Sequence, residues 1–251
     1  MSKKIEIKSI ASKEEVNNRE NLLQLFLNSP LPDNEKLFNT GLFLKRQELS
    51  KMLFLNLLYL ELLKVQGVII EFGVRWGQNL VTLTNLRGIY EPYNYGRKII
   101  GFDTFEGFKN ISEQDGSHKI IHDGAFSVTD NYQNYLEKLL NTHEKESPLN
   151  HLKKSIIVKG DAIAKLNDYL KDNPETIIAF AYFDFDIYKP TKECLQLILP
   201  HMSKGAILVF DELLDPQFPG ETIALKEVLD ITKYKIHRNP FGGLQSYIIL
   251  D

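Results

Sequence analysis

The sequence predicts an α/β fold: a seven-stranded, mostly parallel sheet with helices on both faces, an antiparallel hairpin at its C-terminal end and a helical N-terminal extension. From residue 67 onward, short β-rich runs alternate with helical runs, which is typical of βαβ units. The apolar runs at 177–183 and 206–210 are unbroken, as expected of strands that helices cover on both faces. The last two β-rich runs are joined by the short Gly- and Pro-containing segment 239–243, which favours a hairpin.

The helical extension comes first along the chain. Apolar residues recur at helical spacing over residues 22–27 and again, densely, over 52–63, with two prolines between the stretches. We therefore expect a helical extension over residues 1–66 and a second unit, which carries the chemistry, over residues 67–251. The extension either covers the functional site or pairs subunits, since its apolar residues favour burial.

The second unit is expected to follow the βαβ order along its length. Strands are predicted at Val68–Phe72, Lys98–Phe102, Ser155–Val158, Ile177–Phe183, Ala206–Phe210, Tyr234–His237 and Gln245–Leu250. Helices are predicted at Gln78–Arg87, Ala162–Leu170, Thr191–Leu199 and Thr222–Leu229. The polar segment 109–131 shows no clear period and is expected to form a loop or lid.

Composition excludes several classes of protein. Among 251 residues, 30 Lys and Arg stand against 33 Asp and Glu, so there is no overall positive field to hold a nucleic acid. The single cysteine, Cys194, excludes an internal disulfide and a multi-cysteine zinc site. No apolar stretch reaches membrane length, and the two lysines near the start are not followed by an apolar signal region. We expect a cytoplasmic protein without a membrane or nucleic-acid partner.

A glycine turn follows the first predicted strand, in the segment Glu71-Phe-Gly73-Val-Arg-Trp-Gly77. The N–H groups at the start of the next helix then face whatever lies across the strand ends. The spacing E-x-G-x-x-x-G lacks the middle glycine that lets a backbone approach a pyrophosphate, so the turn suits a nucleoside without a diphosphate, such as S-adenosylmethionine. The alternative is that these glycines serve only the conformation of the turn.

Acidic residues end the next strands. Asp103 closes the second strand, where it either accepts hydrogen bonds from ribose hydroxyls or caps a helix. Asp161 follows the third strand, where it either accepts the exocyclic amine of adenine or acts as the N-cap of the next helix. Both positions are therefore candidates for binding a nucleoside.

Further acids follow the fourth and fifth strands, at Asp184, Asp186, Asp211 and Glu212. Adjacent parallel strands would bring Asp184, Asp211 and Glu212 to one sheet edge, where they repel one another unless a cation neutralises them. Oxygen ligands and the absence of nearby cysteines or a histidine pair favour Mg²⁺ or another hard divalent ion. Asp186 is either a further ligand or a substrate contact.

Taken together, these motifs resemble the macrocin O-methyltransferase (TylF-like) family. The most specific elements are D-T-F-E-G-F at 103–108 and D-F-D-I-Y at 184–188, with G-D-A at 160–162 between them. The resemblance covers about residues 67–251, and a sheet of this order looks like the Rossmann-like class I methyltransferase fold. It implies an S-adenosylmethionine-dependent O-methyltransferase that methylates a hydroxyl of a sugar or sugar nucleotide with the help of a divalent metal, commonly Mg²⁺.

The resemblance also implies roles for individual residues. It implies cofactor contacts at Glu71, Gly73, Asp103 and Asp161, and metal ligands at Asp184, Asp211 and Glu212. Beside these, we expect cofactor contacts at Trp76, Thr104, Phe105, Ala162 and Asp184, and a catalytic role for Asp184. The chain departs from the family at Glu212, which stands where a second aspartate is usual, although glutamate still supplies oxygen ligands. Chelation by Mg²⁺ would lower the pKa of the acceptor hydroxyl and orient its oxygen.

The general base and the partners are less closely specified. His118 and His122 lie in the expected lid and are the imidazoles available there, although solvated loop histidines are the commoner case. We expect a homo-oligomer, dimeric or larger. Three alternatives stay open: a catechol or other phenol as the acceptor, a nicotinamide-dependent oxidoreductase on the same fold, and a non-catalytic binding module with the helical extension as its interface.

Overall fold

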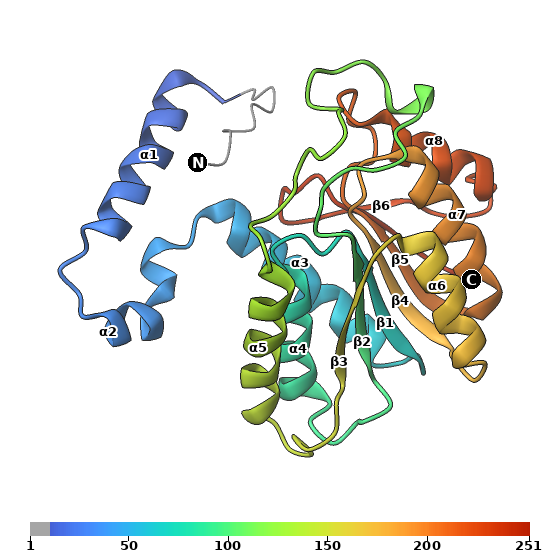
Figure 1. The fold of residues 1–251 in the computed structure, drawn as a ribbon, viewed down its shortest axis with the longest axis horizontal. Coiled ribbons are helices and arrows are strands. Elements are labelled where there is room, and N and C mark those ends of the chain that lie inside the picture. Colours follow the sequence, from blue (N-terminus) through green and yellow to red (C-terminus); the bar gives the residue numbers. More distant parts are fainter. Residues whose placement is uncertain (1–10) are drawn as a thin grey trace.

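A seven-stranded sheet forms the centre of the computed structural model, which describes residues 11–251 (Figure 1). The strand order is β3-β2-β1-β4-β5-β7-β6. The strands are β1 (Val68–Phe72), β2 (Ile99–Asp103), β3 (Ser155–Lys159), β4 (Ile178–Phe183), β5 (Met202–Phe210), β6 (His237–Arg238) and β7 (Ser246–Ile249). The first five run parallel, and β7 is antiparallel to both β5 and β6. The predicted fold class, including the C-terminal hairpin, is confirmed.

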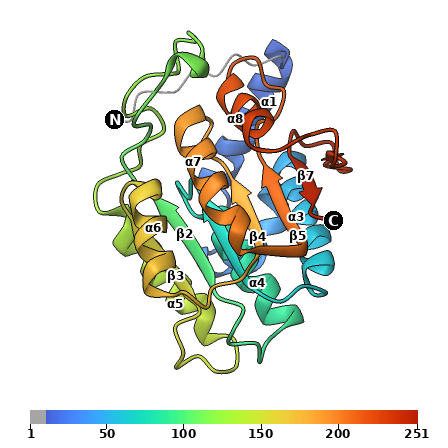
Figure 2. The same cartoon turned by 90° about the vertical axis from the view of Figure 1, so that its right-hand side faces the viewer.

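Helices cover both faces of the sheet (Figure 2). One face carries α3 (Arg46–Leu62), α4 (Gln78–Tyr90) and α5 (Tyr132–Lys145), and the other carries α6 (Ala162–Asp172), α7 (Tyr188–Ile198) and α8 (Pro219–Val228). Shorter elements are α2 (Asp33–Phe38), η1 (Thr40–Phe43), η2 (Glu113–Asp115) and η3 (Leu199–His201), and α1 (Lys13–Leu27) is the first helix described. Helix α5 was not among the predicted helices, although Leu136 and Leu140 lie four residues apart on its buried face, which is the spacing of an amphipathic helix.

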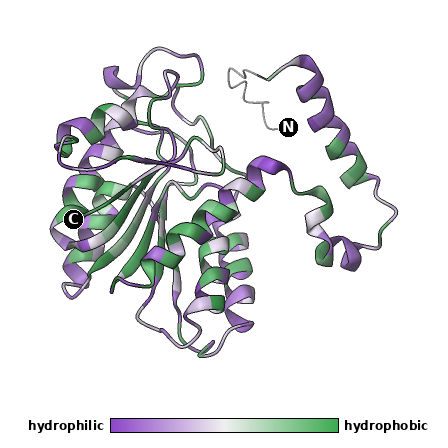
Figure 3. Ribbon diagram, turned by 180° about the vertical axis from the view of Figure 1, so that it is seen from behind, coloured by the Kyte–Doolittle hydropathy of each residue, from purple (hydrophilic) through white to green (hydrophobic). Residues whose placement is uncertain are grey.

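Two apolar cores lie on either side of the sheet because successive strand residues point to opposite faces. In β1, Ile69 packs with α3, α4 and α5, whereas Ile70 and Phe72 pack with α6, α7 and α8. The strands are accordingly apolar along most of their length (Figure 3). Glu71 has the parity of Ile69, so its carboxyl group points toward the α3 side.

The predicted N-terminal extension divides into two parts. Phe54, Leu58 and Leu62 of α3 are fully buried in the core beside α4, so this helix belongs to the body of the molecule. By contrast, α1 and α2 bury no residue and stand away from the sheet (Figure 1). Residues 1–10 of the expected extension, which include the lysines near the start of the chain, lie outside the described residues.

The segment between β2 and α5 runs over the carboxyl ends of the strands (Figure 1). Apart from η2 it is irregular, as expected for residues 109–131. Phe108, Ile120 and Ala125 form a small apolar cluster with Ile187 and Phe218. We call residues 104–131 the cover loop.

Asp115 fixes the cover loop to the body of the molecule. Its carboxylate is fully buried and accepts the backbone N–H of Tyr188, at the start of α7, at 2.5 Å.

Across residues 11–251, none of the helices combines the length and apolar character that crossing a membrane requires.

Candidate active site

A cavity of about 260 Å³ lies at the carboxyl edge of the sheet, with residues of the cover loop forming part of its wall. Ligands bind at this edge in open α/β sheets. Nine of the residues singled out from the sequence line it: Gly73, Asp103, Thr104, Asp161, Ala162, Asp184, Asp186, Asp211 and Glu212. The fold therefore brings together acids that are more than a hundred positions apart in the chain.

Gly73 lets the turn after β1 pass close to the end of β4. Its φ of +85° is unfavourable for other residues, and an added Cβ would lie 1.9 Å from the carbonyl oxygen of Asp184. The turn after β1 therefore depends on a glycine at this position.

Asp103 organises the same turn through its carboxylate. It accepts the backbone N–H groups of Arg75 at 2.7 Å and Phe105 at 2.5 Å. Burial raises the pKa of Asp103 above its usual value, while these N–H groups act in the opposite direction. A carboxylate has about four lone-pair positions, so two remain for ribose hydroxyls.

Asp161 is the N-cap of α6. Its Oδ1 accepts the backbone N–H of Ala164 at 3.0 Å, and its Oδ2 accepts the side-chain amide of Asn110 at 3.2 Å. The capping role considered from the sequence is thus present, and the same carboxylate ties the cover loop to the cavity wall. The contact with adenine stays a prediction.

Glu71 is a buried acid beside the cavity, with a residue exposure of 1%. Its Oε2 and the Oδ1 of the neighbouring Asn79 are buried without a hydrogen-bond partner among the described residues. Burial first, and then the charge of Asp184, raise the pKa of Glu71 well above its usual value. Such an orphaned carboxylate fits a ligand with a positive group, as S-adenosylmethionine has in its ammonium and sulfonium.

The ends of β4 and β5 carry the cluster that we call the acid rim: Asp184, Asp186, Asp211 and Glu212. The backbone N–H of Asp211 donates to the carbonyl of Phe183 at 3.0 Å, which keeps the two strand ends side by side. Burial, followed by the charge of Asp211, raises the pKa of Asp184 to about 7 and that of Glu212 to about 9. These raised values are the expected response of acids crowded into a covered site.

Lys51 meets the acid rim from α3, and sequence reasoning missed it. Its Nζ lies 3.1 Å from Oδ1 of Asp211 and 3.6 Å from Oδ2 of Asp184. Burial alone would lower the pKa of the ammonium, but the charges of Asp211 and Asp184 outweigh it and hold that pKa above its usual range. The sequence signal that could have indicated Lys51 was a lysine directly before the apolar run 52–63.

The rim residues fit a hard divalent cation in the chemistry of their donors. Carboxylate oxygens are the ligands that Mg²⁺ prefers, and one nitrogen atom already lies within 3.6 Å of both Asp184 and Asp211. Within residues 11–251, however, no three or more His, Cys, Asp or Glu side chains are grouped so as to hold a metal ion. Glu212, the third expected ligand, lines the cavity without completing such a group.

The remaining residues expected from the sequence do not line this cavity. Trp76 is 42% exposed and meets Tyr132 of α5 edge-on, and Phe105 packs into the core on the α5 side. His118 and His122 lie in the cover loop, where their ring nitrogens contact backbone groups of that loop. The structure therefore brings neither histidine to the acid rim.

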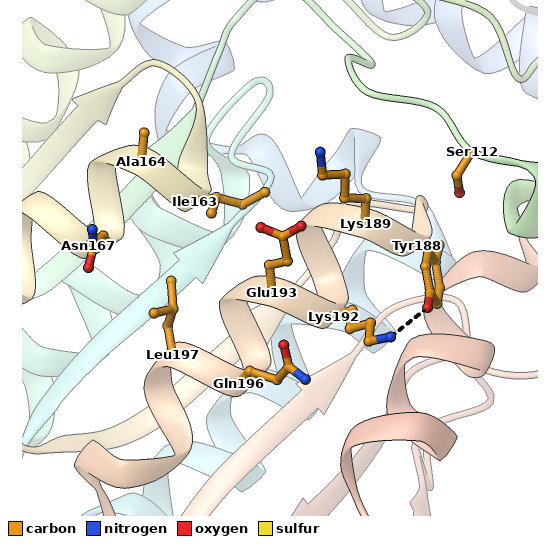
Figure 4. Close-up of a pocket in the computed structure, with 10 residues that line it drawn as sticks. All are labelled: Ser112, Ile163, Ala164, Asn167, Tyr188, Lys189, Lys192, Glu193, Gln196 and Leu197. Carbon is orange, nitrogen blue, oxygen red and sulfur yellow. Dashed lines mark hydrogen bonds between the residues drawn. The ribbon is translucent and has the colours of Figure 1, made fainter.

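A second cavity lies between α6 and α7 (Figure 4). It has a volume of about 720 Å³ and contains no residue of the acid rim. Lys192 lines it and donates to the Tyr188 hydroxyl at 2.8 Å (Figure 4). This second cavity is lined mainly by long side chains on the outer surface of α7, so we do not assign the cavity to the reaction.

Comparisons with known proteins place the chain in a family. No protein-family model matches it, and no curated protein matches it. Among solved structures, it is 41% identical to CalS11, described as calicheamicin methyltransferase, over 96% of this chain and 94% of that one, with a TM-score of 0.93. An apo structure of CalS11, described as TDP-rhamnose 3'-O-methyltransferase, is 40% identical over 96% of each chain, with a TM-score of 0.84.

A more distant structure shares the fold. The O-methyltransferase NovP is 15% identical over 80% of this chain and 79% of that one, with a TM-score of 0.56. The two CalS11 structures carry the closer relation, because their identity extends over nearly the whole chain. The chain belongs to the class I S-adenosylmethionine-dependent O-methyltransferases, in the macrocin O-methyltransferase (TylF-like) family of sugar methyltransferases that its motifs resemble.

Proposed function

We propose that this O-methyltransferase methylates a hydroxyl of a sugar nucleotide and that a divalent cation, most simply Mg²⁺, assists the reaction. The observation that carries the proposal is one cavity lined both by Asp103, which would face the adenosyl group, and by the acid rim. The similarity to a protein described as TDP-rhamnose 3'-O-methyltransferase supports a sugar nucleotide as the acceptor class.

On the cofactor side, the chain supplies a carboxylate for each part of S-adenosylmethionine that can donate or carries positive charge. Asp103 would accept the ribose hydroxyls with its free lone pairs. Glu71 would face the methionine end, where its orphaned oxygen gains a positive partner. Gly73 leaves the turn free of side-chain atoms between these two groups.

On the acceptor side, Asp184 and Asp211 would hold the cation. A bound Mg²⁺ would lower the pKa of the chelated hydroxyl and neutralise the acids. A carbon–oxygen bond forms as the carbon–sulfur bond breaks, sulfur keeps the electron pair, and the hydroxyl proton passes to a rim carboxylate. The cover loop, which is fixed by its apolar cluster, would limit the access of water to this edge of the sheet.

The test is a methyl-transfer assay with S-adenosylmethionine, a panel of TDP-sugars and a panel of catechols, after EDTA treatment and with or without added Mg²⁺. We expect methylation of a TDP-sugar, at least a tenfold loss without Mg²⁺, and loss of activity in Asp184→Asn. Asp123→Asn is the matched control, because Asp123 is an exposed residue of the cover loop that pairs with Lys109. Preferential methylation of catechols would contradict the acceptor class, and full activity without metal would contradict the metal.

We also propose that the protein is a homo-oligomer, with the helices before α3 as part of the contact between copies. Leu37, Phe38 and Leu42 are 72%, 80% and 65% exposed, although each is large and apolar. Clustered exposure of this kind usually marks a contact surface. A cytoplasmic location likewise stays a prediction.

A further inference from the structure

Lys51 is held at the acid rim by the way its helix packs. Phe54, Leu55 and Leu58, the next large apolar residues of α3, are almost completely buried in the core. The backbone of Lys51 is therefore fixed, and only its side chain can move. The Lys51 ammonium also lies over the ring of Tyr182, 5.6 Å from its centre.

The ammonium lies between the two carboxylates that would hold a divalent cation. The nearest oxygens of Asp211 and Asp184 are 3.1 Å and 3.6 Å from Nζ. A cation bound by both carboxylates needs their oxygens at about 2.0–2.6 Å. Ammonium and metal would repel each other at so short a separation, so we expect Lys51 to leave when the metal binds.

A place for the displaced ammonium lies in a neighbouring cavity. This cavity has a volume of about 680 Å³, and it is formed by the start of α3, Gln78 and residues 241–245. Lys51 lines both this cavity and the one that contains the acid rim. Its long side chain can therefore turn from one cavity to the other without any movement of the backbone.

Glu48 supplies an unused acceptor at that second place. It precedes Lys51 by three residues on α3, so the two side chains project from neighbouring positions of one helix face. Oε1 of Glu48 pairs with Lys45 at 2.8 Å. Its Oε2 is buried and has no hydrogen-bond partner in the described part of the chain. A buried carboxylate oxygen without a donor is costly, and the Lys51 ammonium would satisfy it.

We propose that Lys51 is a positioning residue with two places: between Asp184 and Asp211 when the rim holds no metal, and on Glu48 when it does. In the first place it holds the two carboxylates together. In the second it leaves the rim open to the metal and the acceptor. This inference rests on the proposed function, because it requires that a divalent cation binds the rim.

The proposal predicts how two substitutions change metal affinity. Lys51→Gln removes the competitor, so Mn²⁺ should bind about tenfold tighter or more, since the apparent affinity of the wild type is reduced by the fraction of time that Lys51 occupies the rim. Glu48→Gln removes the second place, so Mn²⁺ should bind several-fold more weakly. In the double variant, Glu48→Gln should no longer change the Mn²⁺ affinity, because the Lys51 ammonium that Glu48 would accept is absent.

Mn²⁺ binding to the full chain is measured by electron paramagnetic resonance and titration calorimetry, without substrate turnover. Lys64→Gln is the matched control: it removes the same charge just beyond α3, where Lys64 is exposed and pairs with Glu61. This control should change the Mn²⁺ affinity less than twofold. Unchanged thermal unfolding and S-adenosylmethionine binding in each variant show that the fold is intact.

Three results would overturn the proposal. They are an unchanged or weaker Mn²⁺ affinity in Lys51→Gln, a Glu48→Gln effect that persists in the double variant, and no Mn²⁺ binding to any variant. The proposed function is read separately, from methyl transfer to TDP-sugars by the wild type. Transfer with an unaltered metal affinity in Lys51→Gln leaves the function standing and removes only the role of Lys51.

Discussion

At the scale of single residues, the site depends on backbone groups as much as on side chains. The carboxylate of Asp103 is held by two N–H groups of the chain, and Gly73 permits a close approach between two strand ends. Both positions were predicted from the sequence, because strand-end acids and glycine turns leave local signals. Lys51 was not, because its position depends on how α3 packs against the sheet.

Gly73→Ala is expected to damage both the fold and the site. The φ of +85° and the clash with the Asp184 carbonyl oxygen together should cost at least about 2 kcal/mol of unfolding free energy. Thermal unfolding should show a decrease in Tm of about 5 °C or more. The control is Gly41→Ala, where an added Cβ meets no atom within 4 Å, and its Tm should stay within about 2 °C of the wild type. Equal Tm values for the two variants would contradict the geometry described for this turn.

Asp103→Asn is expected to weaken S-adenosylmethionine binding while the protein remains folded. The amide keeps one acceptor oxygen but loses the charge-assisted hydrogen bonds to ribose and backbone, which should raise the Kd by about 10- to 100-fold. Titration calorimetry with S-adenosylhomocysteine measures the change. Asp123→Asn should bind as the wild type does, and an unchanged Kd in Asp103→Asn would mean that ribose lies elsewhere.

At the scale of elements, α3 connects the sheet to the acid rim. Its buried side packs on the sheet beside α4, and its first two turns carry Glu48 and Lys51. Helix α3 therefore serves two purposes, one in the core and one at the cavity.

Leu58→Ala tests whether α3 is part of the same folding unit as the sheet. Leu58 is fully buried, so the substitution should lower the unfolding free energy by about 2–5 kcal/mol in a single urea transition. Leu60→Ala, two residues on and 41% exposed, should cost less than about 1 kcal/mol. Two separate transitions, with only the smaller one shifted by Leu58→Ala, would indicate that α3 unfolds independently.

The connection between α4 and β2 should make stability depend on pH through Glu91. Burial by itself would raise the pKa of Glu91, but hydrogen bonds from Arg97, Asn94 and Tyr59 outweigh it and lower that pKa. A carboxyl with a lowered folded-state pKa adds stability above its unfolded pKa, and this stability is lost as the pH falls through the folded value.

The measurement for Glu91 is the difference in Tm between the wild type and Glu91→Gln across pH. The difference should be constant from about pH 7 to about pH 5 and should shrink toward pH 3. Glu61→Gln removes an exposed pair with Lys64 and should show almost no difference at any pH. A difference for Glu91→Gln that grows on acidification would have the wrong sign.

Most elements could be predicted from the sequence, and not every exception has a physical cause. The parallel strands are continuous apolar runs, and each was predicted within a few residues of its observed bounds, except that β5 extends back to Met202 along half-exposed residues. Helix α5 is an exception without such a cause, since Tyr132, Leu136 and Leu140 recur at helical spacing and the helix was nevertheless missed. The site followed the same rule: acids at strand ends were predictable, whereas the positions of Trp76 and His118 depend on loop packing that no local pattern specifies.

At the scale of the whole molecule, the described chain consists of a packed body and an N-terminal arm. The arm, which we define as residues 11–44, has no buried residue and carries several large apolar side chains on its surface. An arm of this composition is unfavourable in water by itself, which is the physical reason to expect contact with another copy.

Light scattering tests this expectation. The wild type should have a mass of at least twice 28.9 kDa, and Leu37→Asp combined with Phe38→Asp should shift it toward the monomer. Ile89→Asp is the control, because Ile89 is 67% exposed on α4, away from the arm. A monomeric wild type would contradict the proposed assembly, and so would a double variant that assembles like the control.

Asp211 is contacted by Lys51 from one side and by Gln245, next to β7, from the other, at 3.1 Å in each case. During synthesis on the ribosome, a chain that has produced α3 and the five parallel strands still lacks the second of these contacts. The rim can reach its final arrangement only after residue 245 has emerged and β7 has paired with β5.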